Sequence, residues 1–458
     1  MTAAAFLLLF IASLAGWFWN RHAAAAVWRR GAKLHSLPAY HGASSALAVA
    51  VPGMVLILVW LALQGAVIDW LVLASLPEAV AAGLDGGTRA LMRSEIGSIA
   101  RGQVFGTPEP WKLEAAAYLG TLTQTSRALL FAAVALASAF ALFMARRKVS
   151  AAFRARQRVE RILHGLMVLC ALAAIFTTAG IVASLAFESA RFFSMVPFTE
   201  FLFGTNWEPQ IPMRADQVAG AGAFGWLPVI LGTLVITVVA MGFSVPVGLF
   251  SAVYLNEFAS PRLRSVAKPL LEMLAGIPTV VYGFFAVLTV APALRSAASA
   301  WGIAVAPNTA LAAGGVMGIM LIPFIASFAD DALSAVPRAL RDGSLALGAT
   351  RAETVTKVLI PAAIPGIAGG VLLAVSRAIG ETMIVVMAAG LIARMTINPL
   401  DSVTTVTVQI VTLLIGDTAF DNPKTLAAFA LGLMLFLVTL AINVLALRLV
   451  RKYREIYD

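Results

Sequence analysis

The feature that most constrains this chain is a series of apolar runs, nearly free of charged residues, that have the length of membrane-spanning helices. A helix needs about 18 to 20 apolar residues to cross roughly 30 Å of hydrocarbon. Nine runs in the 458-residue sequence fit this requirement, near residues 3–19, 44–68, 128–145, 165–187, 224–254, 269–293, 308–329, 364–393 and 425–447. Because helices satisfy their backbone hydrogen bonds internally, they are the form in which such runs cross a bilayer. The sequence therefore predicts an all-α polytopic membrane protein.

Composition supports this class. Hydrophobic residues make up 60% of the chain and charged residues 12%, whereas about a quarter of the residues of a soluble domain are charged. A net charge of +10 is compatible with nucleic-acid binding, but membrane proteins concentrate Lys and Arg in their cytoplasmic loops. We therefore expect membrane lipid, and no nucleic acid, around this chain.

The distribution of basic residues predicts an orientation. Basic clusters follow the first, third, fifth, seventh and ninth runs, within residues 21–33, 146–161, 262–264, 338–357 and 448–454. Since every cluster follows an odd-numbered run, we expect the N-terminus outside and the C-terminus in the cytoplasm of a multi-pass inner (plasma) membrane protein. A cleaved signal peptide is the alternative for the first run, but no Lys or Arg precedes that run, and we expect the helix to be retained.

A basic stretch near residues 150–160 divides the chain. Residues 1–160 form an N-terminal extension with about three transmembrane helices and a partly ordered external loop at about 74–126. Residues 161–458 form a second transmembrane domain, whose cytoplasmic loop covers about 330–361. Further external segments are expected at about 188–222, 294–307 and 394–424.

The polar stretch DGSLALGATRAETVTKVLIP (Asp342–Pro361) lies in that cytoplasmic loop. Its composition fits two short helices joined at Gly348, with Pro361 ending the second before the chain re-enters the membrane. Such an elbow presents a rigid surface to a partner in the cytosol. An ordinary amphipathic loop is the alternative.

Charged residues interrupt the eighth run at Arg377 and Glu381. Residues four apart share one face of a helix, so we expect these two side chains to lie about one turn apart. Ionisable residues at membrane depth normally face a bundle interior or an aqueous path. They therefore mark either a substrate path or a structural ion pair. Lys268 and Glu272 have the same spacing and are expected to form a surface pair.

Several chemistries are not expected from this sequence. Cys170 is the single cysteine, the four histidines lack metal-ligand spacing, and no GxxxxGK[ST] phosphate loop is present. We expect no catalytic residue, metal or cofactor in this chain. Any ATP hydrolysis would then belong to another subunit.

The elbow resembles the EAA loop of ABC importer permeases. Gly348, the nine-residue gap after it and Pro361 match that pattern, with Val358 and Ile360 in its apolar positions. Asp-Gly-Ser, at Asp342–Ser344, stands where the family has Glu-Ala-Ala. The resemblance implies that Asp342, Gly348 and Pro361 belong to a coupling helix that seats in a groove of the ATPase subunit.

Four further segments resemble the PstC-type permease family of phosphate importers: FLFGTNWEP at Phe201–Pro209, the run Gly232–Ala259, KPLLEMLAGIPTVVYGFFA at Lys268–Ala286, and SRAIGETMIV at Ser376–Val385. The resemblance covers roughly residues 160–455. It implies a six-helix, type I (MetI-like) permease core preceded by three extra transmembrane helices, as in long-form members.

The same resemblance implies a set of partners and a function. The partners are an ATPase dimer that uses ATP and Mg, a PstA-type sister permease, an external phosphate-binding protein and inorganic phosphate. The function is ATP-driven phosphate import. Independently of the resemblance, the charges of Arg377 and Glu381 at membrane depth lead us to expect both residues in the substrate path. The alternatives are import of another oxyanion, such as sulfate, molybdate or a phosphonate, and a membrane sensor or scaffold derived from a permease.

The orientation can be tested with topology reporters. A reporter fused after Lys33 or Lys148 is expected to be cytoplasmic, because basic loops stay on that side of the membrane. A reporter at Gly102 is expected to be external. Protease or alkylation access from each side of the membrane measures both, and a cytoplasmic Gly102 reporter would contradict the predicted helix count.

Overall fold

The computed structural model describes residues 2–76, 86–103, 108–210, 222–415 and 422–453. Within these residues nine helices are long and apolar enough to cross a membrane. This confirms the predicted all-α polytopic class and the predicted number of spans. Contacts divide the chain into two units, Met1–Phe176 and Thr177–Asp458. The division falls in helix α6 (Ala155–Met195), which also contains the boundary predicted at residue 160.

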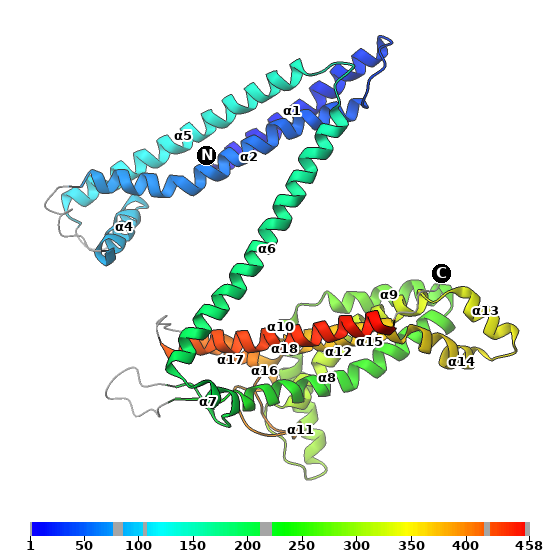
Figure 1. Cartoon of the computed structure of the whole chain (residues 1–458). Helices are drawn as coiled ribbons and strands as arrows, with labels where there is room; N and C mark the ends of the chain where they lie inside the picture. The colour runs from blue at the N-terminus through cyan, green and yellow to red at the C-terminus, as the bar shows by residue number, and fades with distance from the viewer. Residues whose placement is uncertain (1, 77–85, 104–107, 211–221, 416–421, 454–458) are drawn as a thin grey trace. The chain divides into compact units, whose positions relative to one another are not determined.

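The first unit is built on three long helices. They are α1 (Thr2–Arg29), α2 (Pro38–Ala74) and α5 (Pro110–Arg147), which run alongside one another in Figure 1. Small residues allow the close approach of α1 and α2. A Cβ atom added at Gly53 would lie 2.3 Å from Leu9 Cδ1, and one at Gly42 would lie 2.7 Å from the Trp17 carbonyl oxygen. Such small-residue contacts are typical of helix packing in membranes.

The segment predicted as an external loop at 74–126 is more helical than expected. Helix α4 (Gly86–Ala100) lies within it, and α5 begins at Pro110. Leu76, Ile96, Ala115 and Ala116 form a small apolar core between α2, α4 and α5. The mixed charges that suggested a loop instead pair on the surface, as in the Arg93–Asp69 and Lys112–Glu95 contacts.

The second unit begins in the C-terminal part of α6. Its elements, in chain order, are α7 (Phe198–Phe203), β1 (Trp207–Glu208), β2 (Ala223–Phe224), α8 (Leu227–Val253), the π-helical segment η1 (Tyr254–Phe258), α9 (Pro261–Ala275), α10 (Thr279–Phe285), the π-helical η2 (Ala286–Val290), α11 (Ala291–Ser299), α12 (Ala310–Ser334), α13 (Arg338–Ala346), α14 (Arg351–Thr354), the π-helical η3 (Val355–Leu359), α15 (Ile360–Ile379), α16 (Met383–Ala388), α17 (Val406–Leu414) and α18 (Pro423–Tyr453).

Helix α12 is the centre of this unit. Glycines on both of its neighbours bring the backbones together: a Cβ added at Gly248 of α8 would lie 2.9 Å from Ile325 Cβ, and one at Gly370 of α15 would lie 2.5 Å from Phe328 Cβ. The main apolar core gathers around α12 and includes Ile236, Met317 and Leu321. Helix α18 also packs against α15 (Figure 1).

The FLFGTNWEP motif folds into α7 and β1. The two-residue strands β1 and β2 pair antiparallel, with Trp207 opposite Phe224. Phe192, Phe201, Trp207, Phe224 and Trp226 form an aromatic core beneath this hairpin. Trp207 Nε1 donates a hydrogen bond of 2.8 Å to Gln409 Oε1, which ties the hairpin to α17.

The sixth predicted run, 269–293, is not one helix. Helix α9 ends at Ala275, and α10 begins at Thr279. Pro278 has no N–H and disfavours helical geometry in the residue before it, so the chain breaks there. The Tyr282 hydroxyl donates a hydrogen bond of 2.8 Å to the Leu274 carbonyl, which satisfies one of the backbone groups freed by the break.

The close contact of α8 with α12 predicts the effect of added volume. Gly248→Val is expected to destabilise the protein by about 1–3 kcal/mol, because the new methyl groups would overlap Ile325. Gly242→Val on the same helix is the matched control, since a Cβ there would meet nothing within 4 Å. The apparent unfolding midpoint of the purified protein measures the difference, and equal midpoints for the two variants would contradict this packing.

Candidate functional site

The predicted elbow is present. Helices α13 and α14 form a bent projection at one end of the second unit (Figure 1), and Gly348 joins them with a φ of +88°. Only glycine adopts that region without steric cost, which explains its position in the motif. Thr350 and Glu353 form a capping box that starts α14.

Pro361 does not end the second arm of the elbow, so that prediction is wrong. The chain passes from α14 through the π-helical η3 into α15 without a break, and Pro361 lies in the first turn of α15. A proline inside an α-helix clashes with the carbonyl four residues earlier. The wider π turn before Pro361 relieves that clash, so the second arm of the elbow, α14, continues into the apolar helix α15 without a break.

The surface of the elbow is unusually exposed. Asp342 and Gly348 are exposed, and the Leu347 side chain is 91% exposed. Leu345 is also exposed, so the end of α13 presents two neighbouring apolar side chains on an otherwise polar surface.

The elbow is attached to the membrane helices by an ion pair. Arg341 of α13 contacts the Glu257 carboxylate of η1, whose side chain is 9% exposed. Within the elbow, the Ser344 and Thr354 hydroxyls lie 3.0 Å apart and link α13 with α14. The elbow is therefore tied to the end of α8 as well as to α15.

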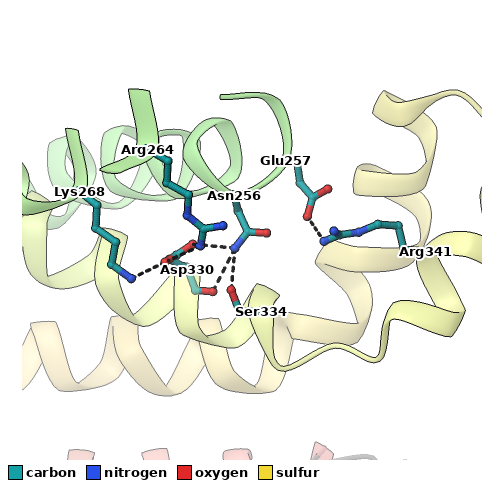
Figure 2. A network of polar contacts seen from close by, with 7 residues as sticks. All are labelled: Asn256, Glu257, Arg264, Lys268, Asp330, Ser334 and Arg341. Atoms are coloured by element: carbon teal, nitrogen blue, oxygen red, sulfur yellow. Dashed lines mark hydrogen bonds and ion pairs between the residues drawn. The ribbon is translucent and has the colours of Figure 1, made fainter. Parts of the chain in front are cut away.

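Next to this ion pair, a network of polar contacts is centred on Asp330, near the end of α12. Arg264 Nη2 and Lys268 Nζ, both from α9, lie 2.9 and 2.6 Å from its carboxylate oxygens. Asn256 Nδ2 of η1 donates to the same carboxylate over 2.6 Å and to Ser334 Oγ over 2.8 Å. Figure 2 shows these side chains converging on Asp330 beside the Glu257–Arg341 pair. One buried carboxylate thus joins three elements.

The expected Lys268–Glu272 pair is wrong. Lys268 reaches Asp330 instead, and this hydrogen bond raises the pKa of Lys268. Sequence reasoning missed Asp330 because it looked for partners along one helix, whereas this pair joins residues far apart in the chain. The available signal was an acidic residue at the end of an apolar run that is otherwise uncharged.

Arg377 lies near the end of α15, at mid-depth of the neighbouring helix α12. Its guanidinium carbon is 5.8 Å from the centre of the Phe324 ring, and Phe324 lies near the middle of α12. The side chain is exposed on this single chain. A guanidinium at this depth needs an aqueous path or another subunit beside it, because exposure to lipid is costly.

Glu381 does not share a helical face with Arg377, contrary to prediction. Helix α15 ends at Ile379, and α16 starts at Met383. Glu381 Oε1 accepts hydrogen bonds of 3.0 and 3.4 Å from the backbone N–H groups of Met383 and Ile384. The carboxylate therefore caps α16, in a break of the chain just beyond Arg377.

Other contacts hold this break in place. Thr407 Oγ1 donates to the Glu381 carbonyl over 2.9 Å. A Cβ added at Gly283 of α10 would lie 2.6 Å from Met387 Sδ, so α10 and α16 pack closely. The two breaks in apolar runs, after α9 and after α15, thus lead into helices that touch each other.

Two protein-family models match separate parts of the chain, one mostly in the first unit and one in the second unit. Residues 6–177 match the family model described as a phosphate ATP-binding cassette transporter. Residues 244–455 match the binding-protein-dependent transport system inner membrane component.

The similarity to individual relatives extends over most of each relative's length. A probable ABC transporter permease of Bacillus subtilis is 33% identical over 272 residues, which is 59% of this chain and 84% of the relative. The phosphate transport system permease protein PstC 1 of Mycobacterium tuberculosis is 32% identical over 55% of this chain and 81% of its own. The chain belongs to the PstC-type permease family of ABC transporters. PstC of Mesorhizobium japonicum is 29% identical over 63% of this permease and 88% of its own length.

The part of the chain that matches the inner membrane component is residues 244–455. The matched relatives align with 46–63% of this permease, in keeping with a core that follows an N-terminal extension. Both the elbow and the Arg377–Glu381 break lie in the part that matches the inner membrane component.

Proposed function

We propose that this PstC-type permease carries inorganic phosphate inward as one subunit of an ATP-driven importer. The observation that carries the proposal is its similarity to phosphate permeases over more than four fifths of their length. The match of residues 6–177 to a phosphate transporter model supports the same substrate. We assign the N-terminal unit no separate activity.

The elbow supports an ATPase partner. Its exposed Leu347 and Asp342 offer a mixed apolar and acidic surface, and its continuity with α15 provides a rigid connection to the membrane. We infer that this end is cytoplasmic and that an ATPase dimer there hydrolyses ATP with Mg. The permease itself is not an enzyme in this scheme.

Two further partners complete the proposed importer. A PstA-type sister permease would form the other half of the pore, and an external binding protein would deliver phosphate to the opposite end. Exposure of Arg377 on the single chain supports a pore shared between two permeases. The importer would lie in the inner membrane with its C-terminus in the cytoplasm.

Arg377 is the proposed anion ligand in the substrate path. Its guanidinium is permanently charged and presents a planar pair of donors that fits two oxygens of an oxyanion. Phosphate and sulfate satisfy this geometry equally well. Discrimination between them therefore requires a second group.

Glu381 is the proposed second group. Hydrogen phosphate has a proton to donate, and sulfate at neutral pH has none, so an ionised carboxylate accepts a hydrogen bond from phosphate and repels sulfate. Glu381 Oε1 is already occupied with the cap of α16. Its other oxygen, Oε2, would accept the hydrogen bond that hydrogen phosphate donates.

This assignment predicts different effects for the two residues. Arg377→Gln is expected to abolish uptake of labelled phosphate with assembly intact, because the positive charge is lost. Glu381→Gln retains an oxygen that can cap α16 but loses the negative charge, so excess sulfate should now compete with phosphate. We expect a shift of about 5- to 150-fold in the phosphate-to-sulfate preference, from a difference of about 1–3 kcal/mol.

A matched variant separates charge from capping. Glu381→Ala removes both the charge and the cap, and it is expected to lower uptake as well as selectivity. If excess sulfate competes with phosphate uptake no better in Glu381→Gln than in the parent protein, Glu381 has only the capping role. If phosphate uptake is absent with the parent protein as well, the proposed function is wrong.

The coupling role of the elbow is tested at Gly348. A valine there cannot adopt a φ of +88° without strain of about 1–3 kcal/mol, so Gly348→Val is expected to lower the phosphate moved per ATP hydrolysed while the protein still inserts. Gly343→Ala is the control, since an added Cβ at Gly343 of α13 would meet nothing within 4 Å, its φ is not positive, and alanine stands at this position in the family motif. Equal transport by the two variants would refute the coupling assignment.

A further inference from the structure

We propose that Asp330 is a positioning residue that links the elbow to the substrate path through helix α9. The proposal rests on the proposed function, because it concerns how movement at the elbow reaches the phosphate path. It is carried by the convergence of Arg264, Lys268 and Asn256 on one buried carboxylate, shown in Figure 2.

The first step of the argument is the way α9 is attached. None of the 15 residues of α9, all of them described, is buried, and the apolar cores around α12 contain no residue from this helix. Helices α8 and α12, by contrast, are held together by an apolar core and close glycine contacts. The Arg264 and Lys268 contacts to Asp330 therefore help to fix the position of α9 on α12, together with half-buried apolar residues such as Leu271.

The second step is what α9 leads to. Its C-terminus enters the break at Gly276–Pro278 and then α10, which packs on α16 at Gly283 and Met387. Helix α16 is the helix capped by Glu381. A shift of α9 relative to α12 would therefore move α10 and, through it, the break that contains Glu381.

The third step joins the same carboxylate to the elbow. Asn256 donates to Asp330, and its neighbour Glu257 pairs with Arg341 of α13. A displacement of the elbow would pull η1, and η1 is bonded to Asp330 and to Ser334 of α12. Asp330 thus lies where the connection from the elbow and the connection to the substrate path meet.

The burial of Asp330 and the exposure of its cationic partners fit contacts that persist while the helices move. Asp330 is 5% exposed, and both cations are more than one third exposed. The carboxylate therefore depends on its partners, whereas Arg264 and Lys268 are solvated when they leave it. Removing the carboxylate releases α9 without leaving an isolated charge in the interior.

The test measures transport and hydrolysis separately in the complete complex, purified from native membranes through a tag on this chain and returned to vesicles. Asp330→Asn is expected to lower the phosphate moved per ATP by roughly tenfold, while basal ATP hydrolysis stays within about twofold. Lys268→Gln should lower the phosphate moved per ATP by less, because Arg264 remains. Lys268→Arg should move as much phosphate per ATP as the parent protein, because it keeps a charged donor. Arg262→Gln, on the same helix but outside the network of Figure 2, is the matched control and should behave as the parent protein.

The outcomes separate this inference from the proposed function. If the parent complex moves phosphate and Asp330→Asn moves the same amount per ATP, the inference is wrong and the proposed function stands. If Asp330→Asn does not assemble, Arg264→Gln and Lys268→Gln decide, since each leaves Asp330 a cation and Asn256 as partners. A normal transport ratio in both single variants and in their double variant would also overturn the inference.

Discussion

The constraint on which this structure depends is that backbone polar groups have no water to bond with inside a bilayer. Most of the chain meets it with uninterrupted helices. Two apolar runs do not, and in both the freed groups have partners: the Tyr282 hydroxyl at the first break, and the Glu381 carboxylate with the Thr407 hydroxyl at the second. Irregular backbone at this depth is tolerated where protein or an aqueous path surrounds it.

The low polarity of the bilayer also explains where the charged residues lie. Charges are rare in the spans of the second unit, where they lie at breaks or near helix ends. Arg377 is exposed beside Phe324 at mid-depth of α12, which is where an anion crossing between two permeases would need a cation. Asp330 is buried among three donors at the elbow end. The hydrogen-bonding capacity of Asp330 is used within the chain, whereas Arg377 is the residue that we propose as the anion ligand.

The helices of the second unit differ in how closely they are packed. Helices α8, α12 and α15 are packed closely through glycines such as Gly248 and Gly370, and we expect them to move together. Helix α9 lies on those helices with no buried residue, and the second arm of the elbow, α14, continues into α15. This division allows a force at the elbow to act on a few polar contacts without disturbing the core.

The sequence by itself determined the class, the nine spans and the elbow, because each depends on local pattern. Apolar length predicts spans, and a glycine between two short helical segments predicts a turn with positive φ. It also placed Arg377 and Glu381 near each other, although it put them on one helix. Only the tertiary structure decided that the helix ends at Ile379, that Pro361 is accommodated by a π turn, and that Lys268 pairs with Asp330 in place of Glu272. The physical reason is that these outcomes depend on groups brought together from distant parts of the chain, and side-chain spacing along one helix carries no information about a partner on another.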